Sequence, residues 1–364
     1  MIFYSTNRTK ESCVLIGLIT AGNKLSTVEE NLKELSDLVL TAGGVVQEKF
    51  IQRKERLNPA YFIGKGKAME ISSYIEKNDI DILIFDDELT PAQIRNWEQL
   101  TNIKVIDRSA LILDIFAAHA RSREARLQVE LAQLTYLLPR LTRQWSHLSR
   151  QVGGIGTKGP GESQLETDRR EVRQRIVHLK KDLKQIEQQG RTRRKNAGRM
   201  KHVSLVGYTN SGKSTLLNAL TGADVLIADK LFATLDTTTR RLRLNDQITV
   251  LISDTVGFIN KLPHHLIASF QSTLAQTREA DLLLHIVDLN DTSYVEHIKT
   301  VQDILRELEI EEKPTLIIFN KVDMIKDGLI IKSAGKHYPH ALFISATQKI
   351  RLEKIKQKLA KMLK

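Results

Sequence analysis

The first 108 residues alternate short apolar runs with longer amphipathic stretches. A short run rich in β-branched residues predicts a buried strand, and an amphipathic stretch predicts a helix. Strands joined by helices need crossover connections, so we expect a small four-stranded parallel α/β domain with helices on both faces. The expected elements are 14–20, 25–40, 45–51, 67–76, 80–85, 91–100 and 103–106, in the order strand, helix, strand, helix, strand, helix, strand.

From Ser109 the apolar spacing changes to that of long helices. One stripe runs along a helix predicted from Ser109 to Leu141, and Ser163 with Glu166 indicates a capping box at the start of a second helix. Two amphipathic helices joined by a loop predict an antiparallel helical hairpin. The two stripes consist of Leu127, Leu131, Leu134, Leu138 and Leu141, and of Leu165, Val172, Ile176, Leu179, Leu183 and Ile186.

The last part of the chain again alternates apolar strand-like runs with helix-like stretches. Four of the runs, 202–206, 248–252, 315–319 and 341–344, are each followed by a polar motif. Ligands bind at the carboxyl ends of strands in a doubly wound sheet, so this order predicts a ligand-binding α/β domain. We therefore divide the chain into a parallel α/β domain at 1–108, a helical hairpin linker at 109–198 and a nucleotide-binding domain at 199–364.

The first polar motif fits the phosphate-binding pattern G-x-x-x-x-G-K-[ST]. It reads Gly207-Tyr208-Thr209-Asn210-Ser211-Gly212-Lys213-Ser214 and stands between a strand-like and a helix-like run. Backbone N–H groups of such a turn converge on phosphate oxygens, Lys213 adds a positive charge, and the Ser214 hydroxyl is a magnesium ligand. The motif therefore predicts a nucleoside triphosphate site.

The remaining motifs favour GTP over ATP. Asp254-Thr255-Val256-Gly257 offers an aspartate for magnesium and a glycine amide for the γ-phosphate. In Asn320-Lys321-Val322-Asp323 the last carboxylate can accept two hydrogen bonds from the Watson–Crick edge of guanine, whereas adenine presents a different pattern. Backbone amides of Ser345-Ala346-Thr347 can support the base carbonyl.

The net charge of +12 is concentrated in one segment. Residues 140–201 hold 17 Lys or Arg and 6 Asp or Glu, a net charge of +11. This concentration predicts a polyanionic partner, RNA in the first place; a solvated charged helix between domains is the alternative. The single cysteine, Cys13, cannot form a disulfide within the chain, and because it lies beside the apolar run 14–19 it is expected to be a small core or boundary residue. With no signal peptide or membrane span, we expect a cytoplasmic protein, part of which can lie at the membrane surface.

The predicted hairpin tip, 142–162, is rich in glycine and basic residues. Arginine and lysine bind phosphates, and Trp145 can stack on an unpaired base, as in single-stranded RNA recognition. A disordered linker is the alternative, and ordering on RNA reconciles the two interpretations. The candidate RNA-binding residues are Arg143, Trp145, Arg150, Lys158, Arg169 and Arg170.

Two signatures resemble those of HflX-family GTPases. They read Gly159-Pro160-Gly161-Glu162-Ser163-Gln164-Leu165-Glu166-Thr167-Asp168-Arg169-Arg170 and Leu231-Phe232-Ala233-Thr234-Leu235-Asp236-Thr237-Thr238-Thr239-Arg240. The resemblance covers nearly the whole chain. It implies an amino-terminal domain, a helical arm and a Ras-like P-loop GTPase domain, in a protein that we expect to be a monomer. It also implies binding to the large ribosomal subunit near the peptidyl-transferase region and splitting of stalled ribosomes, with GTP permitting tight binding and hydrolysis permitting release.

The resemblance also implies a role for each motif. Residues from Gly207 to Thr215 hold the phosphates, Ser214 and Thr234 bind Mg²⁺, and Asp254 with Gly257 faces the γ-phosphate. Asn320 and Asp323 recognise guanine, and Ser345 with Ala346 supports the base. The first switch supplies five more nucleotide-binding residues, Phe232, Ala233, Thr234, Leu235 and Asp236. Where the family usually has proline after that aspartate, this chain has Thr237, which leaves the loop less constrained.

The sequence leaves hydrolysis without an assigned catalytic residue. Phe258 follows Gly257, where Ras-type enzymes have a glutamine, and it can neither position water nor compensate charge. We therefore expect slow intrinsic turnover that the ribosome stimulates. Asn210 is a candidate ligand for K⁺ in place of an arginine finger, and it is equally a residue that only stabilises the turn.

Other functional classes share this chemistry. The same motifs are needed by a GTPase that assists large-subunit assembly. They are also needed by a signalling GTPase that acts on a protein partner and uses the basic segment only for localisation. A structural RNA-binding protein with a vestigial nucleotide site is disfavoured by the intact motif series. The sequence leaves open whether rescue or assembly is the main task and whether ATP binds elsewhere.

Overall fold

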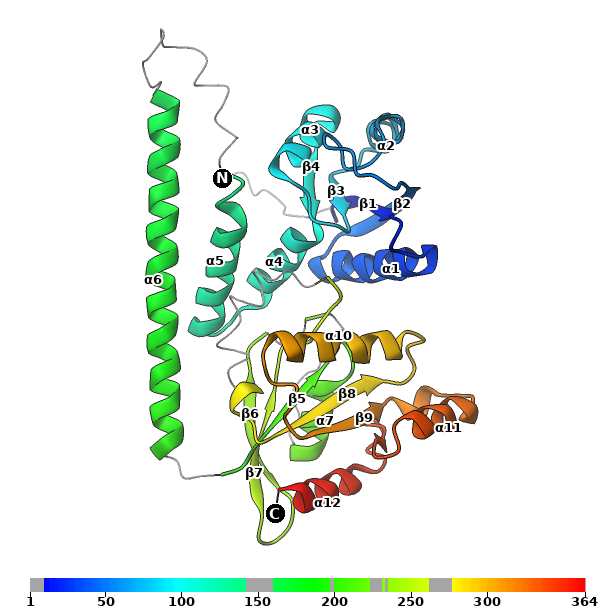
Figure 1. The fold of residues 1–364 in the computed structure, drawn as a ribbon, viewed down its shortest axis with the longest axis vertical. Helices are drawn as coiled ribbons and strands as arrows, with labels where there is room; N and C mark the ends of the chain where they lie inside the picture. Colours follow the sequence, from blue (N-terminus) through cyan, green and yellow to red (C-terminus); the bar gives the residue numbers. More distant parts are fainter. Residues whose placement is uncertain are drawn as a thin grey trace, which may run out of the picture. The chain divides into compact units, whose positions relative to one another are not determined.

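The structure, a computed structural model, describes residues 10–141, 160–196, 200–222, 231–232, 235–261 and 277–363. The chain forms two compact units, Met1–Ala118 with Ala132–Val177, and His119–Leu131 with His178–Lys364. Each unit has its own sheet (Figure 1). The unit boundaries fall within the helices of the middle region, so the division into three domains stays a prediction. Among the described helices, none has the length and apolar character needed to cross a membrane.

The first unit contains the predicted parallel sheet. Its strands are β1 (Ser12–Ile19), β2 (Val45–Arg53), β3 (Ile82–Phe85) and β4 (Lys104–Asp107), in the order β2-β1-β3-β4. All three pairings are parallel. The central strand β1 is an almost continuous apolar run, as expected of a strand buried on both faces. The edge strand β2 instead exposes Glu48 and Lys49, which protects the edge from pairing with other chains.

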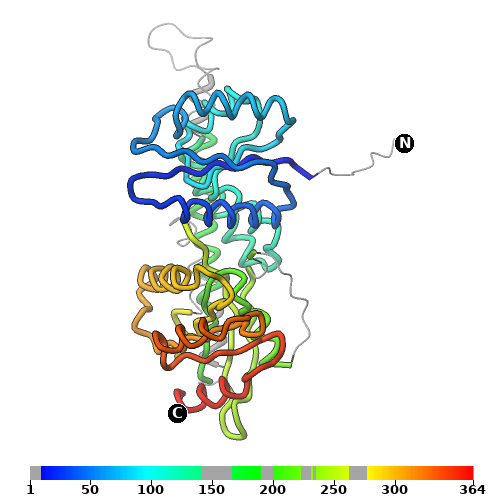
Figure 2. Tube along the Cα trace, turned by 90° about the vertical axis from the view of Figure 1, so that its right-hand side faces the viewer, coloured from blue at the N-terminus to red at the C-terminus, as the bar shows by residue number. Residues whose placement is uncertain are grey.

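Helices cover both faces of this sheet, as Figure 2 shows with α1 on one side and α2 and α3 on the other. Their bounds are Leu25–Ala42 for α1, Lys65–Asn78 for α2 and Pro91–Thr101 for α3. Alternate β1 residues Val14, Ile16 and Leu18 pack with α2 and α3 in one core cluster. On the other face α1 lies directly over Gly17, where an added Cβ would meet Val28 Cγ1 at 2.8 Å. Cys13 is buried, as predicted, and burial raises the pKa of its thiol to about 11.

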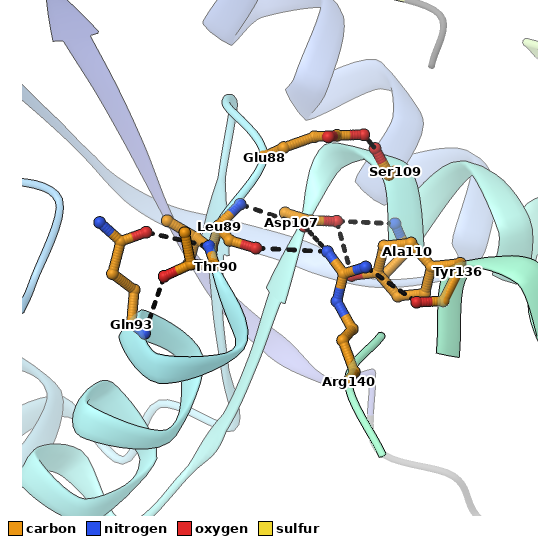
Figure 3. Close-up of polar contacts among 9 residues, drawn as sticks. All are labelled: Glu88, Leu89, Thr90, Gln93, Asp107, Ser109, Ala110, Tyr136 and Arg140. Atoms are coloured by element: carbon orange, nitrogen blue, oxygen red, sulfur yellow. Dashed lines mark hydrogen bonds and ion pairs between the residues drawn. The ribbon is translucent and has the colours of Figure 1, made fainter. Parts of the chain in front are cut away.

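The carboxyl edge of the first sheet carries two buried aspartates that bind arginines of the chain. Arg108, the first residue of α4 (Arg108–His119), forms ion pairs with Asp86 at 2.7 Å and Glu34 at 2.9 Å. Asp107 accepts hydrogen bonds from Tyr136 Oη at 2.9 Å and Arg140 Nη2 at 3.0 Å (Figure 3). These carboxylates, at the edge where α/β sheets bind ligands, are therefore engaged within the chain.

The prediction of one long helix from Ser109 to Leu141 is wrong. The chain forms α4 and then α5 (Arg123–Leu137), with residues 120–122 between them. Ser122 Oγ accepts a hydrogen bond from Ala125 N at 3.1 Å and so caps a new helix start. α5 ends at Leu137, shortly before Pro139, because proline disfavours helix at the residue that precedes it. Of the predicted stripe only Leu131 is fully buried; the other buried positions of α5 are Ala125, Gln128, Val129, Ala132 and Tyr136.

The second linker helix, α6, is longer than predicted. It spans Pro160–Asn196, so the predicted start at a Ser163–Glu166 capping box is wrong, because the helix begins three residues earlier. Proline suits the first helical position, since its fixed φ is already helical and its missing N–H is not needed there. The side chains described in α6, 166–189, confirm part of the predicted stripe: Leu179 and Leu183 are buried, and Val172, Ile176 and Ile186 are half-buried. Residues 142–159 of the predicted tip lie outside the described residues.

The second unit contains a six-stranded sheet in the order β10-β9-β8-β5-β7-β6. Only the β6–β7 pairing is antiparallel. β6 is one of the two edge strands and has the sequence TTRRLR, whose charges protect that edge. The strands are β5 (His202–Gly207), β6 (Thr238–Arg243), β7 (Thr249–Asp254), β8 (Leu282–Asp288), β9 (Thr315–Asn320) and β10 (Leu342–Phe343).

Helices cover both faces of the second sheet as well. One core cluster joins the sheet to α7 (Lys213–Thr221) and α12 (Leu352–Met362). On the other face β8 packs against α10 (Tyr294–Glu307), and Ala334 of α11 (Gly328–His337) packs near Phe319. The 3₁₀ helix η1 (Val322–Met324) follows β9. The sheet thus places four loops at the carboxyl ends of β5, β7, β9 and β10, where the sequence motifs lie.

Candidate nucleotide-binding site

The phosphate-binding motif forms the turn from β5, in the middle of the sheet, into α7. Gly207 has φ +155°, Asn210 +57° and Gly212 +90°, so the loop reverses direction through conformations that glycine and asparagine tolerate. A Cβ at Gly207 would overlap the carbonyl oxygen of Ile286, and one at Gly212 would overlap Asn320 Nδ2. The two glycines therefore permit both the turn and the close approach of β8 and β9.

Lys213 lies buried beneath this loop. Its ammonium donates hydrogen bonds to Tyr208 O at 2.8 Å and Gly207 O at 3.2 Å. Burial lowers the pKa of Lys213 to about 8, and the charge of Asp254 partly opposes that shift. An anion bound at this helix N-terminus would stabilise the buried ammonium and raise its pKa towards the ordinary value.

Ser211 gives a second sign that the loop fits phosphate. Its Oγ is buried and has no hydrogen-bond partner among the described residues. Buried hydroxyls are nearly always hydrogen-bonded, so an acceptor supplied by a ligand fits this position. The loop thus combines a buried cation, a helix N-terminus and a free hydroxyl donor, which is the donor set that a polyphosphate requires.

Ser214 and Asp254 form the candidate magnesium site. Ser214 Oγ donates to Asp254 Oδ2 at 2.6 Å, and Asp254 is buried at the end of β7. A hydroxyl and a carboxylate oxygen are ligands that Mg²⁺ prefers. The other predicted ligand, Thr234, lies outside the described residues.

Thr209 joins the phosphate loop to the first switch and to the segment that begins at the end of β7, residues 254–261, which we call the second switch. Its N–H donates to Phe258 O at 2.7 Å, and Phe258 N donates back to Gly207 O at 3.1 Å. Its Oγ1 accepts from Phe232 N at 3.2 Å. Gly257 lies so close that an added Cβ would meet Thr209 Cα at 2.7 Å and Lys213 Nζ at 3.1 Å. The segment expected to face the γ-phosphate is thus held directly against the loop that binds the phosphates.

The predicted guanine-binding residues meet at the ends of β9 and β10. Asn320 Nδ2 donates to Ser211 O at 3.0 Å, and Asn320 Oδ1 accepts from Ala346 N at 3.0 Å. The side chain of Asn320 therefore ties the phosphate loop to the Ser345-Ala346-Thr347 loop. Asp323 is exposed in η1, and Thr347 is exposed next to buried Ala346. An exposed carboxylate beside this junction is accessible to a guanine base.

The structure also shows contacts that the motifs alone did not predict. Lys321 forms an ion pair with Asp288 at 2.7 Å, the Tyr208 ring stacks on His297 with centroids 3.8 Å apart, and Tyr208 Oη accepts from Asn260 N at 2.7 Å. No local signal identifies these partners, because each belongs to a segment distant in sequence. The ion pair holds Lys321 to the end of β8, and the two contacts of Tyr208 hold the phosphate loop to α10 and to the segment that follows β7.

The predicted site residues lie in several parts of the structure, and two of them, Arg169 and Arg170, lie on α6. Those of the phosphate loop and of the three later motifs lie together at the carboxyl edge of the second sheet. Thr255 serves the fold, since its hydroxyl donates to Leu205 O at 2.6 Å, and Thr215 lies in the first turn of α7. In the first switch Phe232 and Leu235 are buried, and Asp236 contacts residues 121 and 122. Outside the described residues lie Ala233, Thr234, Arg143, Trp145, Arg150 and Lys158.

This fold and site define a P-loop guanine-nucleotide-binding protein. Three family models match consecutive parts of the chain. "GTP-binding GTPase N-terminal" matches residues 29–117, "GTP-binding GTPase Middle Region" residues 119–197, and "50S ribosome-binding GTPase" residues 202–321. The crystal structure of SsGBP in complex with GDP is similar over 97% of this chain and 98% of that one, with a TM-score of 0.51 and 25% identity.

Curated relatives identify the family. The GTPase HflX of Flavobacterium psychrophilum is 47% identical over 96% of this chain and 89% of its own length. That of Escherichia coli is 50% identical over 82% of this chain and 70% of its own length. The chain belongs to the HflX family of GTPases, and it converts GTP and water into GDP and phosphate.

Proposed function

We propose that this GTPase binds the large ribosomal subunit and splits stalled ribosomes, and that GTP hydrolysis allows its release. The observation that supports this most strongly is the match of residues 202–321 to the "50S ribosome-binding GTPase" model, in a chain with a net charge of +11 within residues 140–201. Ribosomal RNA is the polyanion that such a segment fits. Because the proposed partner is the ribosome, we expect a monomeric protein in the cytoplasm.

In this proposal the site binds GTP with Mg²⁺. Ser214 and Thr234 would bind the metal, which neutralises charge on the β- and γ-phosphates. Lys213 and the amides of the phosphate loop orient the phosphates, and Asp323 selects guanine. The burial of Lys213 beneath the loop and the exposure of Asp323 support these two roles.

Hydrolysis depends on a group that the described residues do not identify. Phe258 is 2% exposed and packs with Val206 and Leu283, so its ring lies in the core rather than beside the phosphates. The activating group is therefore expected from the ribosome, and intrinsic turnover is expected to be slow. Equal turnover with and without large subunits would contradict this step.

Potassium stays a further candidate cofactor, with Asn210 as its ligand. The left-handed conformation of Asn210 also suits a residue that only stabilises the turn. Turnover in potassium and in sodium, each with an Asn210→Ala control, separates the two roles. A difference between the salts that disappears in the variant supports a bound potassium ion.

We place the proposed RNA interface on the basic segment, residues 140–201. Arg143, Trp145, Arg150 and Lys158 would bind ribosomal RNA from the predicted tip, and Arg169 with Arg170 from the start of α6. Arg170 is exposed, as this role requires. Phosphate contacts made by this segment would give the steep dependence on salt that is typical of nucleic-acid binding.

Sedimentation of intact ribosomes tests the proposal. Ribosomes are incubated with the protein and GTP, GDP or a non-hydrolysable GTP analogue. We expect separated subunits with GTP and with the analogue but not with GDP, and protein retained on the large subunit only with the analogue. Binding to isolated large subunits without splitting would favour an assembly role. An absence of binding in every nucleotide form would favour a signalling GTPase with a protein partner.

A further inference from the structure

Asp236 makes its contacts with the start of α5 rather than with the phosphate loop. Its carboxylate accepts hydrogen bonds from Arg121 N at 3.1 Å and from Ser122 N at 3.2 and 3.3 Å. The Ser122 hydroxyl donates to the same carboxylate. Ser122 and Arg121 lie 114 and 115 positions before Asp236 in the chain, but all three residues belong to the same compact unit. The contact therefore joins the first switch directly to the helical arm.

The chemistry of this contact is that of an anion at a helix N-terminus. Ser122 caps α5 through the hydrogen bond from Ala125 N to its Oγ, and the two amides before the helix point to Asp236 instead of to a helical carbonyl. A carboxylate at this end is also stabilised by the helix dipole. Without Asp236 these amides lose their acceptor, so the first residues of α5 are less well held.

Asp236 lies in a segment that is held on both sides of Thr234. On one side Phe232 is 2% exposed, and its N–H donates to Thr209 Oγ1 of the phosphate loop. On the other side Leu235 is 2% exposed, and β6 begins at Thr238. Only Leu235 lies between Thr234 and Asp236 in the chain, so the anchoring of Asp236 limits where Thr234 can lie.

We propose that Asp236 is a positioning residue for GTP hydrolysis, which acts through the N-terminus of α5 and does not contact the nucleotide. This rests on the proposed role of Thr234 as a magnesium ligand. The amides of Arg121 and Ser122 hold Asp236, and Asp236 holds the first switch so that Thr234 reaches the metal. Coupling is reciprocal, so GTP, which orders this segment through the metal and the γ-phosphate, also fixes the start of α5.

The first test is a double-mutant cycle on the full-length protein without ribosomes. For Asp236→Ala we expect kcat for GTP to fall about tenfold or more, because a small displacement of a reacting group is costly. Since GDP lacks the γ-phosphate, its affinity should stay within about twofold. Ser122→Ala removes the hydroxyl but leaves both amides, so kcat should fall less in this variant than in Asp236→Ala. The double variant should lose no more than Asp236→Ala alone, because both changes disrupt one contact.

Additive losses in the cycle would overturn the proposal. So would an equal loss of GTP and GDP affinity in Asp236→Ala, because that result would place the carboxylate on the nucleotide. Asp246→Ala is the matched control: Asp246 belongs to the same unit, its side chain is 95% exposed, and it pairs only with nearby Arg243 among the described residues. Its turnover should equal that of the unchanged protein.

Hydrogen exchange distinguishes this positioning role of Asp236 from a purely structural role. In the unchanged protein, amides 121–126 should exchange more slowly with a GTP analogue than with GDP, and Asp236→Ala should remove that difference. An identical difference in the variant would contradict the proposal. Neither test uses ribosomes, so the two proposals can fail separately. If the protein splits ribosomes but the losses in the mutant cycle are additive, the role of Asp236 is wrong. If the losses are not additive but the protein does not split ribosomes, the proposed function is wrong.

Discussion

At the scale of single residues, the nucleotide site places two titratable groups out of water. Burial lowers the pKa of Lys213 to about 8, and burial together with the charge of Lys213 lowers the pKa of His285 to about 4. His285 lies on β8, paired in register with Val206 of β5. Its neutral form therefore belongs to the folded state, and a proton on this ring opposes folding.

The stability of the protein should fall at mildly acidic pH because of His285. The folded-state pKa of about 4 is below the unfolded value of 6.5, so between these values the unfolded chain binds the additional proton. The unfolding free energy of the protein minus that of His285→Leu should fall by about 1.4 kcal/mol for each pH unit from 6.5 down to about 4. Urea unfolding at several pH values measures it. The exposed His340→Gln should show no such trend, and a constant difference for His285→Leu would contradict the assignment.

Gly257 should tolerate no side chain. A Cβ there would meet Thr209 Cα at 2.7 Å, so Gly257→Ala must push the second switch away from the phosphate loop. We expect kcat for GTP to fall roughly tenfold or more, because the γ-phosphate contact is misplaced. Single-turnover hydrolysis provides the measurement. Gly328→Ala is the control, since a Cβ at Gly328 meets nothing within 4 Å and turnover should be unchanged.

At the scale of elements, the buried polar cluster of Figure 3 anchors the end of α5 to the first sheet. Arg140 Nη2 binds Asp107 at 3.0 Å and Leu89 O at 3.3 Å, and the guanidinium lies 3.4 Å from the centre of the Tyr136 ring. Burial and the charge of neighbouring Asp107 raise the pKa of Tyr136, so the Tyr136 hydroxyl keeps its proton and donates it to Asp107 in a hydrogen bond. The cluster fixes the point from which the chain enters residues 142–159.

Removal of the Tyr136 hydroxyl should weaken this anchor. Tyr136→Phe keeps the ring beside Arg140 but takes a donor from buried Asp107, which should lower the free energy of unfolding by about 2 kcal/mol. Urea unfolding measures the change. Tyr61→Phe in the same unit is the control, because no hydrogen bond of the Tyr61 hydroxyl occurs within the described residues. Equal effects of the two substitutions would show that Asp107 does not depend on Tyr136.

The elements themselves were largely predictable from the sequence. The four strands of the first sheet lie within two residues of the predicted runs, because β-branched runs between amphipathic stretches carry a clear signal. The break before α5 was not predictable. Its residues 121 and 122 bond to Asp236, more than a hundred positions away, and no local pattern reports that contact. The start of α6 was misplaced because a capping-box pattern occurred inside a helix that proline begins.

The candidate site shows the same limit. The four motifs were located from spacing alone, since each follows a strand, and the structure places them at one edge of the sheet. Their mutual contacts were not predicted. Asn320 was expected at guanine, yet its side chain also bonds to Ser211 O and Ala346 N. Such bonds depend on how distant loops meet, which only the folded sheet determines.

At the scale of the whole molecule, the helical middle region belongs to both compact units. The unit boundaries fall within α5, between Leu131 and Ala132, and within α6, between Val177 and His178. Residues 140–201, which include α6, carry a net charge of +11 out of the total of +12. In the second unit Asp236 contacts the start of α5, and in the first unit Arg140 anchors the chain just beyond the end of α5.

If the protein binds the large ribosomal subunit as proposed, the basic segment, residues 140–201, should determine how that binding depends on salt. Arg170 and Arg173 are exposed on α6, so Arg170→Gln with Arg173→Gln removes two charges without disturbing a core. If both contact phosphates, large-subunit affinity should fall, and the slope of log affinity against log salt should become shallower by about 1 for each contact. GTP turnover without ribosomes should stay unchanged. Lys326→Gln with Lys332→Gln removes two exposed charges from the second unit and is the control. An unchanged slope in the arginine variant, or an equal change in the lysine variant, would show that binding to the large subunit depends on another surface.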